Sequence, residues 1–182
     1  MDLSFFVNQV LTGLASASSL FLVASGLTLI FGVSRIVNFA HGSMFMLGAY
    51  VAVTVYAPIV SALGPAIGPW VAMLIAALAI GLIGVVIELL LLRRLYHAPH
   101  MLQILATFGI VLIVQDAVVL IWGYDQIVGP RIPGLRGAVT IFGLRFPQYE
   151  LFMLFVGPAI FVALWLLLHR PRWGTLVRAA TR

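Results

Sequence analysis

The chain has 182 residues, of which 63% are hydrophobic and 8% charged, whereas a soluble domain carries about 25% charged residues. No soluble core could hide so much apolar surface, so the composition predicts one all-α membrane domain over residues 1–182, with about five spans. The formal net charge of +5 is typical of basic cytoplasmic loops in a membrane protein and does not indicate nucleic-acid binding.

Two membrane spans are predicted in the N-terminal region, one from about Phe5 to Phe31 and one from about Ile36 to Tyr56. The first apolar run is too long for the apolar core of a secretory signal. Asp2 also stands where such a signal carries positive charge. We therefore expect this run to be an uncleaved first span.

Four polar side chains recur along the first predicted span at spacings of four, four and three residues, which places them on one helix face. They are Asn8, Thr12, Ser16 and Ser19. In hydrocarbon such a face must turn away from lipid, either to pack on neighbouring helices or to line a wet path. Packing is the simpler interpretation, and the four residues are candidates for a permeation path or its gate.

Between the first two spans, Arg35, Asn38 and His41 follow one another at three-residue steps, and Gly42 comes next. This pattern predicts a helix that starts at or beneath the membrane surface, with Asn38 as its N-cap. His41 could hydrogen-bond backbone groups that an interrupted helix leaves free. A single His without a second base is weak support for proton coupling. Structural capping and a direct role in permeation or gating both stay open for Asn38, His41 and Gly42.

A third span is predicted from Trp70 to Leu92, after the Gly/Pro-rich turn at residues 64–69. It should stop at the basic pair that begins with Arg93. A fourth span is predicted from about Met101 to Trp122.

Two carboxylates lie inside these spans, Glu88 in the third and Asp116 in the fourth, and an isolated carboxylate in hydrocarbon is costly. Each is therefore expected to have a partner or a water-filled neighbour. Glu88 and Arg93 differ by five positions, which puts them on different faces of an α-helix. Arg35 or Arg94 is the expected partner of Glu88, and such an ion pair would most simply fix the register of the helices.

One long loop, residues 123–150, precedes a fifth span predicted from about Leu151 to Leu168. Within the loop, residues 139–146 alternate in polarity around Gly143, which predicts a small hairpin lying at the membrane surface. A short apolar run of this kind could also be helical, so the sequence leaves that choice open.

The arginines orient the predicted spans, because loops on the cytoplasmic side of a membrane carry an excess of positive charge. One set of alternate loops holds seven of them, Arg35, Arg93, Arg94, Arg170, Arg172, Arg178 and Arg182. The other set holds Arg131, Arg136 and Arg145. This split predicts an N-terminus outside the cell and a C-terminus in the cytoplasm.

The chain has no cysteine, no phosphate-binding P-loop, no zinc-binding H-E-x-x-H pattern and no G-x-S-x-G nucleophile motif. We therefore expect no enzyme activity, no cofactor and no metal site. If the protein moves a solute against a gradient, the energy must enter through a partner protein or an ion gradient.

The segment Gly26–Tyr50, GLTLIFGVSRIVNFAHGSMFMLGAY, resembles the second-span region of the high-affinity branched-chain amino acid permeases of ABC importers. The resemblance extends over essentially the whole chain. It implies a multi-pass protein of the bacterial inner membrane that translocates a small-molecule substrate through the lipid bilayer. It also implies a second permease subunit, cytoplasmic ATP-binding subunits and a periplasmic substrate-binding protein as partners.

The C-terminal segment Arg172–Ala180 is similar to the start of the cytoplasmic coupling loop of that family. The resemblance makes Gly174 and Arg178 candidates for coupling to the ATPase. Family members are longer and add further spans after this loop. The chain is therefore expected to be the N-terminal part of a longer permease, ending within the coupling loop.

Three alternatives remain beside this interpretation. Urea, short-chain amides or other amino acids are carried by closely similar permeases. A proton-coupled secondary transporter would use Glu88, Asp116 or His41, and its uptake would follow the pH gradient and ignore ATP depletion. A membrane scaffold without transport activity is the third alternative.

Overall fold

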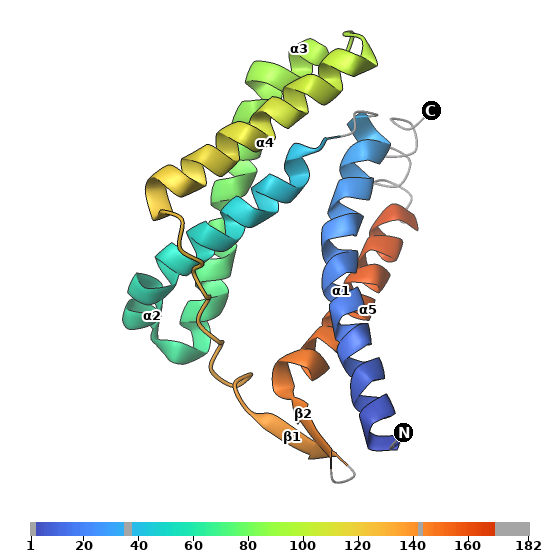
Figure 1. The fold of residues 1–182 in the computed structure, drawn as a ribbon, viewed down its shortest axis with the longest axis vertical. Helices are drawn as coiled ribbons and strands as arrows, with labels where there is room; N and C mark the ends of the chain where they lie inside the picture. Colours follow the sequence, from blue (N-terminus) through green and yellow to red (C-terminus); the bar gives the residue numbers. More distant parts are fainter. Residues whose placement is uncertain (1–2, 35–37, 142–143, 170–182) are drawn as a thin grey trace. The chain divides into compact units, whose positions relative to one another are not determined.

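The computed structural model describes residues 3–34, 38–141 and 144–169 of the chain. Its elements, in order, are α1 (Leu3–Ser34), α2 (Ala40–Ile87), the π-helical turn η1 (Glu88–Leu92), α3 (Arg93–Leu95), α4 (His100–Trp122), β1 (Ala138–Ile141), β2 (Leu144–Pro147) and α5 (Gln148–His169) (Figure 1). Among the described residues, four helices are long and apolar enough to cross a membrane. They are α1, α2 with its continuation to Leu95, α4 and α5, so the prediction of an all-α membrane domain is confirmed.

The chain divides into two compact units. Unit 1 combines residues 1–33 with residues 131–182 and therefore brings together the two ends of the chain. Unit 2 is the continuous segment of residues 34–130.

In unit 2, α2 reverses direction at Gly64. Its 48 residues would extend about 72 Å as one straight helix, more than twice the thickness of a bilayer core. Gly64 has φ 79° and ψ 168°, a conformation that residues with a Cβ rarely adopt. Beyond it, a Cβ on Gly68 would lie 2.7 Å from Cα of Val60, and one on Gly48 would lie 3.4 Å from Cγ1 of Ile80. Both pairs straddle Gly64 symmetrically, so the two arms pack against each other in antiparallel directions (Figure 1).

The core of unit 2 lies between the two arms of α2, η1 and α4. On α4 the buried residues recur every three or four positions, which makes one stripe along the helix. The cluster consists of Ala40, Leu47, Leu92, Ile110, Val114 and Val118. At the end of α4, the Trp122 ring lies 5.4 Å from the Tyr50 ring, and its Nε1 donates to Oγ1 of Thr54 at 2.8 Å.

In unit 1, α1 and α5 pack in parallel. Three contacts follow one another in the same order along both helices, from Thr12 with Glu150, through Ser18 with Gly157, to Phe21 with Phe161. A Cβ on Gly157 would lie 2.6 Å from Oγ of Ser18, so glycine at this position allows the two helices to approach closely.

The parallel packing of α1 and α5 determines how many membrane crossings are assigned to α2. Two helices that cross a membrane in the same direction need an odd number of crossings between them. With α4 as one crossing, α2 must supply two, which its reversal at Gly64 does. Five crossings are therefore compatible with the four candidate membrane helices among the described residues, and the number of crossings stays a prediction.

The predicted hairpin is confirmed. Strands β1 and β2 pair in antiparallel register from Ala138 opposite Pro147 to Ile141 opposite Leu144, while residues 142–143 between them lie outside the described residues. At the open end of the hairpin, the Gly137 N–H donates to Oε1 of Gln148 at 3.1 Å, and the Gln148 N–H donates to the Gly137 carbonyl at 3.0 Å.

Two predicted helix ends were wrong. The second span does not stop at Tyr56, because α2 continues through Pro58, which is tolerated where neighbouring helices and side chains satisfy the freed carbonyl. The third span does not stop before Arg93, because the helix continues through η1 and α3 to Leu95. Long basic side chains can stay in a helix at the membrane surface while their charged ends reach water.

Candidate functional site

On the polar face of α1, Thr12 bonds another helix, although its side chain, like those of Ser16 and Ser19, is exposed on the chain. Oγ1 of Thr12 donates to Oε2 of Glu150 in α5 at 2.9 Å, and Asn8, one turn earlier, is half-buried. Ser16 and Ser19 are exposed, and the Ser19 hydroxyl donates to the Ser16 carbonyl at 2.8 Å. The face is thus partly covered by α5, and its second half is available to other protein or to water.

Glu150, which the sequence analysis did not single out, lies in the first turn of α5. Its negative charge there is favoured by the unpaired N–H groups at the helix start. The carboxylate accepts the hydrogen bond from Thr12 across a gap of 138 positions. No short-range pattern could have indicated this contact, because it depends on the parallel packing of two helices at opposite ends of the chain.

The N-cap of α2 is Phe39, which makes no side-chain cap hydrogen bond, so the predicted N-cap, Asn38, lies one position earlier, although its side chain still bonds the helix start. Oδ1 of Asn38 accepts a hydrogen bond from the Ala40 N–H at 3.0 Å, and the Asn38 carbonyl accepts one from the His41 N–H at 3.2 Å. The hydroxyl of Ser43, which is buried, donates to the Ala40 carbonyl at 2.9 Å. These bonds lie in the first turn of a helix whose first residue, Ala40, also begins a candidate membrane span.

His41 and Gly42 differ in their surroundings. His41 is half-buried. Gly42 is exposed, and no atom lies within 4 Å of the position that its Cβ would occupy. Within this chain, Gly42 is therefore not required for a close helix contact. Arg35, Gly174 and Arg178 lie outside the described residues.

Among the described residues, the partner that the structure gives Glu88 is Tyr96, whose hydroxyl donates to Oε1 of the carboxylate. The expected pairing of Glu88 with Arg94 is not seen there. Residues six positions apart lie on different faces of a helix. The π-helical turn, in which the Arg93 N–H donates to the Glu88 carbonyl, adds one residue to the turn and so brings Tyr96 onto the face of Glu88. The expected alternative partner, Arg35, lies outside the described residues.

The connection between α3 and α4 is held at both ends. Partial burial, together with the hydrogen bond to Glu88, raises the pKa of Tyr96 to about 12, so its hydroxyl stays protonated and donates at any physiological pH. Nε2 of Gln103, a buried side chain, donates to the carbonyls of Leu95 at 3.0 Å and Ala98 at 3.1 Å. The sequence analysis missed both residues, since neither belongs to a recognisable motif.

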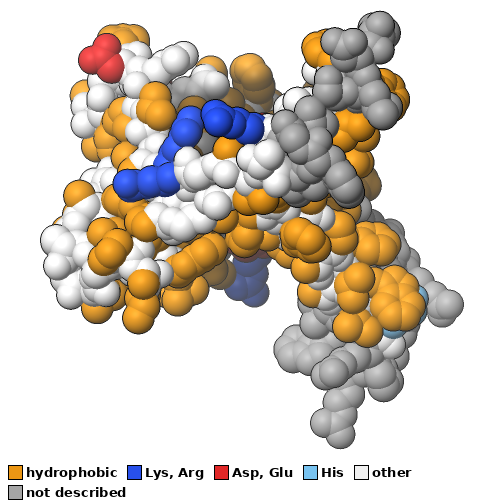
Figure 2. Space-filling view, turned by 90° about the horizontal axis from the view of Figure 1, so that it is seen from below, with side chains coloured by type: hydrophobic (Ala, Val, Ile, Leu, Met, Phe, Trp, Pro, Cys, Tyr) orange, Lys and Arg blue, Asp and Glu red, His pale blue; other side chains and the backbone are white. Residues whose placement is uncertain are grey.

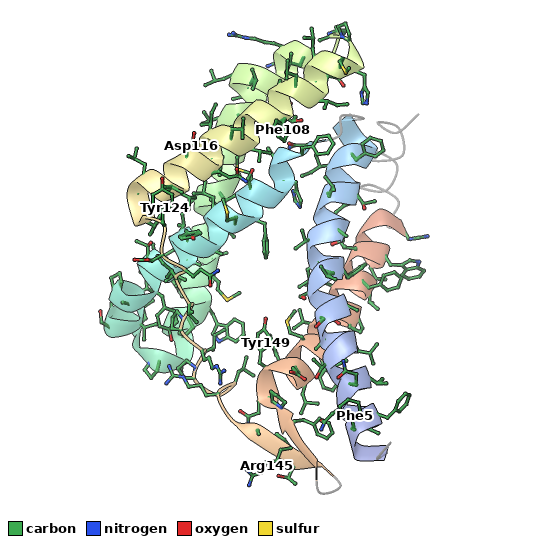
Figure 3. The ribbon with its side chains drawn as sticks, viewed as in Figure 1. Phe5, Phe108, Asp116, Tyr124, Arg145 and Tyr149 are labelled. Atoms are coloured by element: carbon green, nitrogen blue, oxygen red, sulfur yellow. The ribbon has the colours of Figure 1, made fainter. Side chains whose placement is uncertain are left out.

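Asp116 lies outside the buried stripe of α4 and is exposed on the chain (Figure 3). The apolar neighbours one turn away on either side, Leu112 and Leu120, are also exposed. A carboxylate is costly on a face that meets hydrocarbon. We therefore expect that further protein or water covers this part of α4 in the membrane.

Residues 9–182 match the family model described as the permease component of the branched-chain amino acid transport system. Among curated proteins, the chain is 26% identical over 182 residues to the high-affinity branched-chain amino acid transport system permease protein BraD of Pseudomonas aeruginosa, covering 96% of this chain and 58% of that protein. It is 28% identical over 134 residues to LivH, a permease protein of the same kind of system, from Escherichia coli K12, covering 70% of this chain and 42% of LivH.

The chain thus spans about half the length of the curated relatives that it matches. LivH of Salmonella typhimurium gives the same identity and the same coverage as the Escherichia coli protein. No solved structure matches the chain.

Proposed function

Because the chain belongs to the branched-chain amino acid transport permease family, we propose that it is the membrane subunit through which an ATP-driven importer translocates branched-chain amino acids. The observation that carries the proposal is the family match over residues 9–182. Proteins of this kind are transport subunits and not enzymes. ATP hydrolysis therefore belongs to separate cytoplasmic subunits in the proposed complex.

The proposed complex contains a second permease subunit, cytoplasmic ATP-binding subunits and a periplasmic protein that delivers the amino acid. The exposed second half of the α1 polar face supports a further membrane partner, because the Ser16 hydroxyl would otherwise lie against lipid. Exposed Asp116 on α4 supports it in the same way. Gly174 and Arg178 are proposed to contribute to ATPase coupling on the cytoplasmic side.

The proposed transport pathway uses the polar residues at the start of α2 and on α1. Asn38, His41 and Gly42 are its candidates on α2, and Asn8, Ser16 and Ser19 are its candidates on α1. Thr12 is assigned instead to the packing of α1 on α5, since its hydroxyl is already bonded to Glu150. The proposed orientation places the start of α1 outside the inner membrane and the end of α5 at the cytoplasm.

The proposal is tested by uptake of labelled leucine in cells that lack their own branched-chain importers and express the full-length permease with its ATPase and binding protein. We expect uptake that stops when ATP is depleted and persists when a protonophore collapses the pH gradient. Unlabelled isoleucine and valine should compete, whereas urea and acetamide should not. The opposite competition pattern would assign the permease to amides, and dependence on the pH gradient would assign it to secondary transport.

Ser16→Leu tests the α1 candidates within this assay. The added apolar bulk should impair assembly or uptake if Ser16 faces protein or a wet path. Leu20→Val, on an exposed apolar position of the same helix, is the matched control and should leave uptake unchanged. If the two variants are tolerated equally, α1 does not use this face.

A further inference from the structure

Basic side chains gather in unit 2 where the second arm of α2 ends and α4 begins. Arg93 and Arg94 begin α3, and both are exposed. His97 lies in the turn that follows, His100 begins α4, and both are also exposed. These four residues are called the basic turn below. Figure 1 shows α3 and the start of α4 together at one end of unit 2.

The length of the second arm of α2 places the basic turn at the depth of lipid headgroups. Residues 65–92 would extend about 42 Å at 1.5 Å per residue. A bilayer is about 30 Å thick across its hydrocarbon core and about 40–45 Å thick with its headgroup layers. With the reversal at Gly64 at one surface, Arg93 and Arg94 therefore reach the headgroup layer of the other surface.

Exposed apolar side chains adjoin the basic turn on its membrane side. Hydrophobic side chains cover much of the molecular surface, as Figure 2 shows. Just before the arginines, Leu89 and Leu90 in η1 are exposed, the second by 62%. Just after the turn, Met101 and Leu105 in α4 are exposed, the first by 77%. Positive charge at headgroup depth is thus followed by apolar surface at acyl-chain depth, which is the order of the two parts of a phospholipid.

Hydrogen bonds keep the basic turn ordered and its positive charge available. The nearby carboxylate of Glu88 is half-buried and accepts from the Tyr96 hydroxyl, and among the described residues no ion pair joins it to either arginine. The turn itself closes through the Ala98 N–H and the Leu95 carbonyl at 3.0 Å. The buried Gln103 side chain donates to the carbonyls of both these residues, so the backbone that carries the basic side chains is fixed.

We infer that the basic turn holds the headgroup phosphate of an anionic phospholipid whose acyl chains lie along η1 and the start of α4. Depth and apolar surface favour a lipid, because a soluble partner could reach the arginines but not Leu90 and Met101 within the membrane. The paired positive charges of Arg93 and Arg94 disfavour the ammonium group of a zwitterionic headgroup and so select the anionic class. The inference goes beyond the charge excess that orients the chain, since that excess requires no bound lipid.

The test measures which phospholipid stays with the full-length permease. The protein is reconstituted in nanodiscs of phosphatidylcholine and phosphatidylglycerol with the same acyl chains, and is then released into a mild detergent. Native mass spectrometry counts the retained lipids. We expect preferential retention of phosphatidylglycerol, weakened by salt. Equal retention of the two lipids by the unmodified protein would overturn the inference.

The variants separate charge from the shape of the side chain. Replacing both Arg93→Gln and Arg94→Gln should lower the retained phosphatidylglycerol about tenfold or more, whereas Arg93→Lys with Arg94→Lys keeps the charge and should retain it. An equal loss in the lysine pair, or full retention in the glutamine pair, would contradict a headgroup site. Thermal unfolding in phosphatidylcholine nanodiscs checks that each variant is folded. If the glutamine pair does not fold, Arg94→Gln alone is used and should lower retention about threefold.

The matched control removes the same charge from the loops on the other side of the spans. Arg131→Gln with Arg145→Gln changes two exposed arginines and should leave the retained phosphatidylglycerol unchanged. Equal losses in the two glutamine pairs would reduce the effect to net charge and overturn the inference.

Two further arms separate a lipid from other occupants of the basic turn. Inorganic phosphate offers the anion without acyl chains, so millimolar phosphate should not displace the retained lipid. Displacement would show that the site recognises the anion alone and would overturn the assignment to a lipid. The second arm adds the ATP-binding subunits. If the glutamine pair at Arg93 and Arg94 keeps phosphatidylglycerol but no longer retains those subunits, the basic turn is a protein contact and the inference fails.

Discussion

At the scale of single residues, most hydroxyl groups in the long helices are satisfied by their own helix. Ser18, Ser25, Thr28, Ser43 and Thr54 each donate to a carbonyl three or four positions earlier. A hydroxyl satisfied in this way needs no wet path in a membrane, which is why the polar stripe on α1 did not by itself decide between packing and permeation. Thr12 differs, because its hydroxyl reaches another helix.

The bond between Thr12 and Glu150 should contribute to stability. Thr12→Val keeps the side-chain shape and removes the donor, so the free energy of unfolding in detergent micelles should fall by about 1–2 kcal/mol. Thr28→Val is the control, since the Thr28 hydroxyl bonds only the Ala24 carbonyl of its own helix. Equal changes in the two variants would show that the contact with α5 adds no stability.

The Tyr96 hydroxyl should stabilise the end of the α2 hairpin in a similar way. Tyr96→Phe leaves the Glu88 carboxylate without its donor and should cost about 0.5–1.5 kcal/mol, because the bond is to a charged group but is partly screened by solvent. Tyr124→Phe serves for comparison, since Tyr124 is 92% exposed. The measurement is the thermal unfolding midpoint of both variants in the same detergent. A midpoint for Tyr96→Phe as high as that for Tyr124→Phe would speak against the contact.

At the scale of elements, the sequence predicted the apolar helices and the hairpin but not how α2 is built. Hydropathy located the apolar runs on both sides of Gly64, and glycine with proline indicated a turn. The structure makes the reversal at a single residue and keeps Pro65 in the first turn of the second arm, where a missing N–H costs little. The π-helical turn at Glu88 carried no sequence signal, since its residues fit an α-helix equally well.

Gly68 should be the position in α2 where a methyl group is least tolerated. Gly68→Ala would bring Cβ to 2.7 Å from Cα of Val60, so the arms must separate, at a cost of about 1–3 kcal/mol. Gly81→Ala on the same arm meets nothing within 4 Å and should gain up to about 1 kcal/mol from helix propensity. Unfolding midpoints of the two variants should therefore move in opposite directions. A shift of the same sign in both would contradict the close packing of the arms.

At the scale of the whole molecule, composition alone predicted a polytopic membrane domain, because no other class tolerates 63% hydrophobic residues with 8% charge. The candidate site was less predictable. The hydrogen bond from the Ala40 N–H to Asn38 is a local contact of the kind that the sequence could indicate, whereas the partners of Thr12 and Glu88 depend on helix packing and on a π-turn. The association of the two chain ends in unit 1 is likewise a property of packing that no local pattern encodes.

The orientation prediction can be tested by cysteine labelling, because the chain has no native cysteine. Single cysteines at Ser61, beside the reversal of α2, and at Ala138, in the hairpin, should react with an impermeant maleimide from outside intact cells. A cysteine at His97 should react only after the cytoplasmic side is opened. Labelling of Ser61→Cys from the cytoplasm alone would show that the topology is inverted.

Because unit 1 is formed by segments from both ends of the chain, it can be completed only late in synthesis. Unit 2 is continuous and can pack as it leaves the ribosome, whereas Thr12 must wait for Glu150, which follows 138 positions later. At roughly 5–20 residues per second that interval is about 7 to 28 seconds. During this time α1 has no α5 to cover it, so the nascent chain passes through a stage in which unit 2 is complete and the first helix still lacks its neighbour. Premature termination before residue 150 would leave α1 permanently at that stage, and membrane quality control would meet the exposed helix.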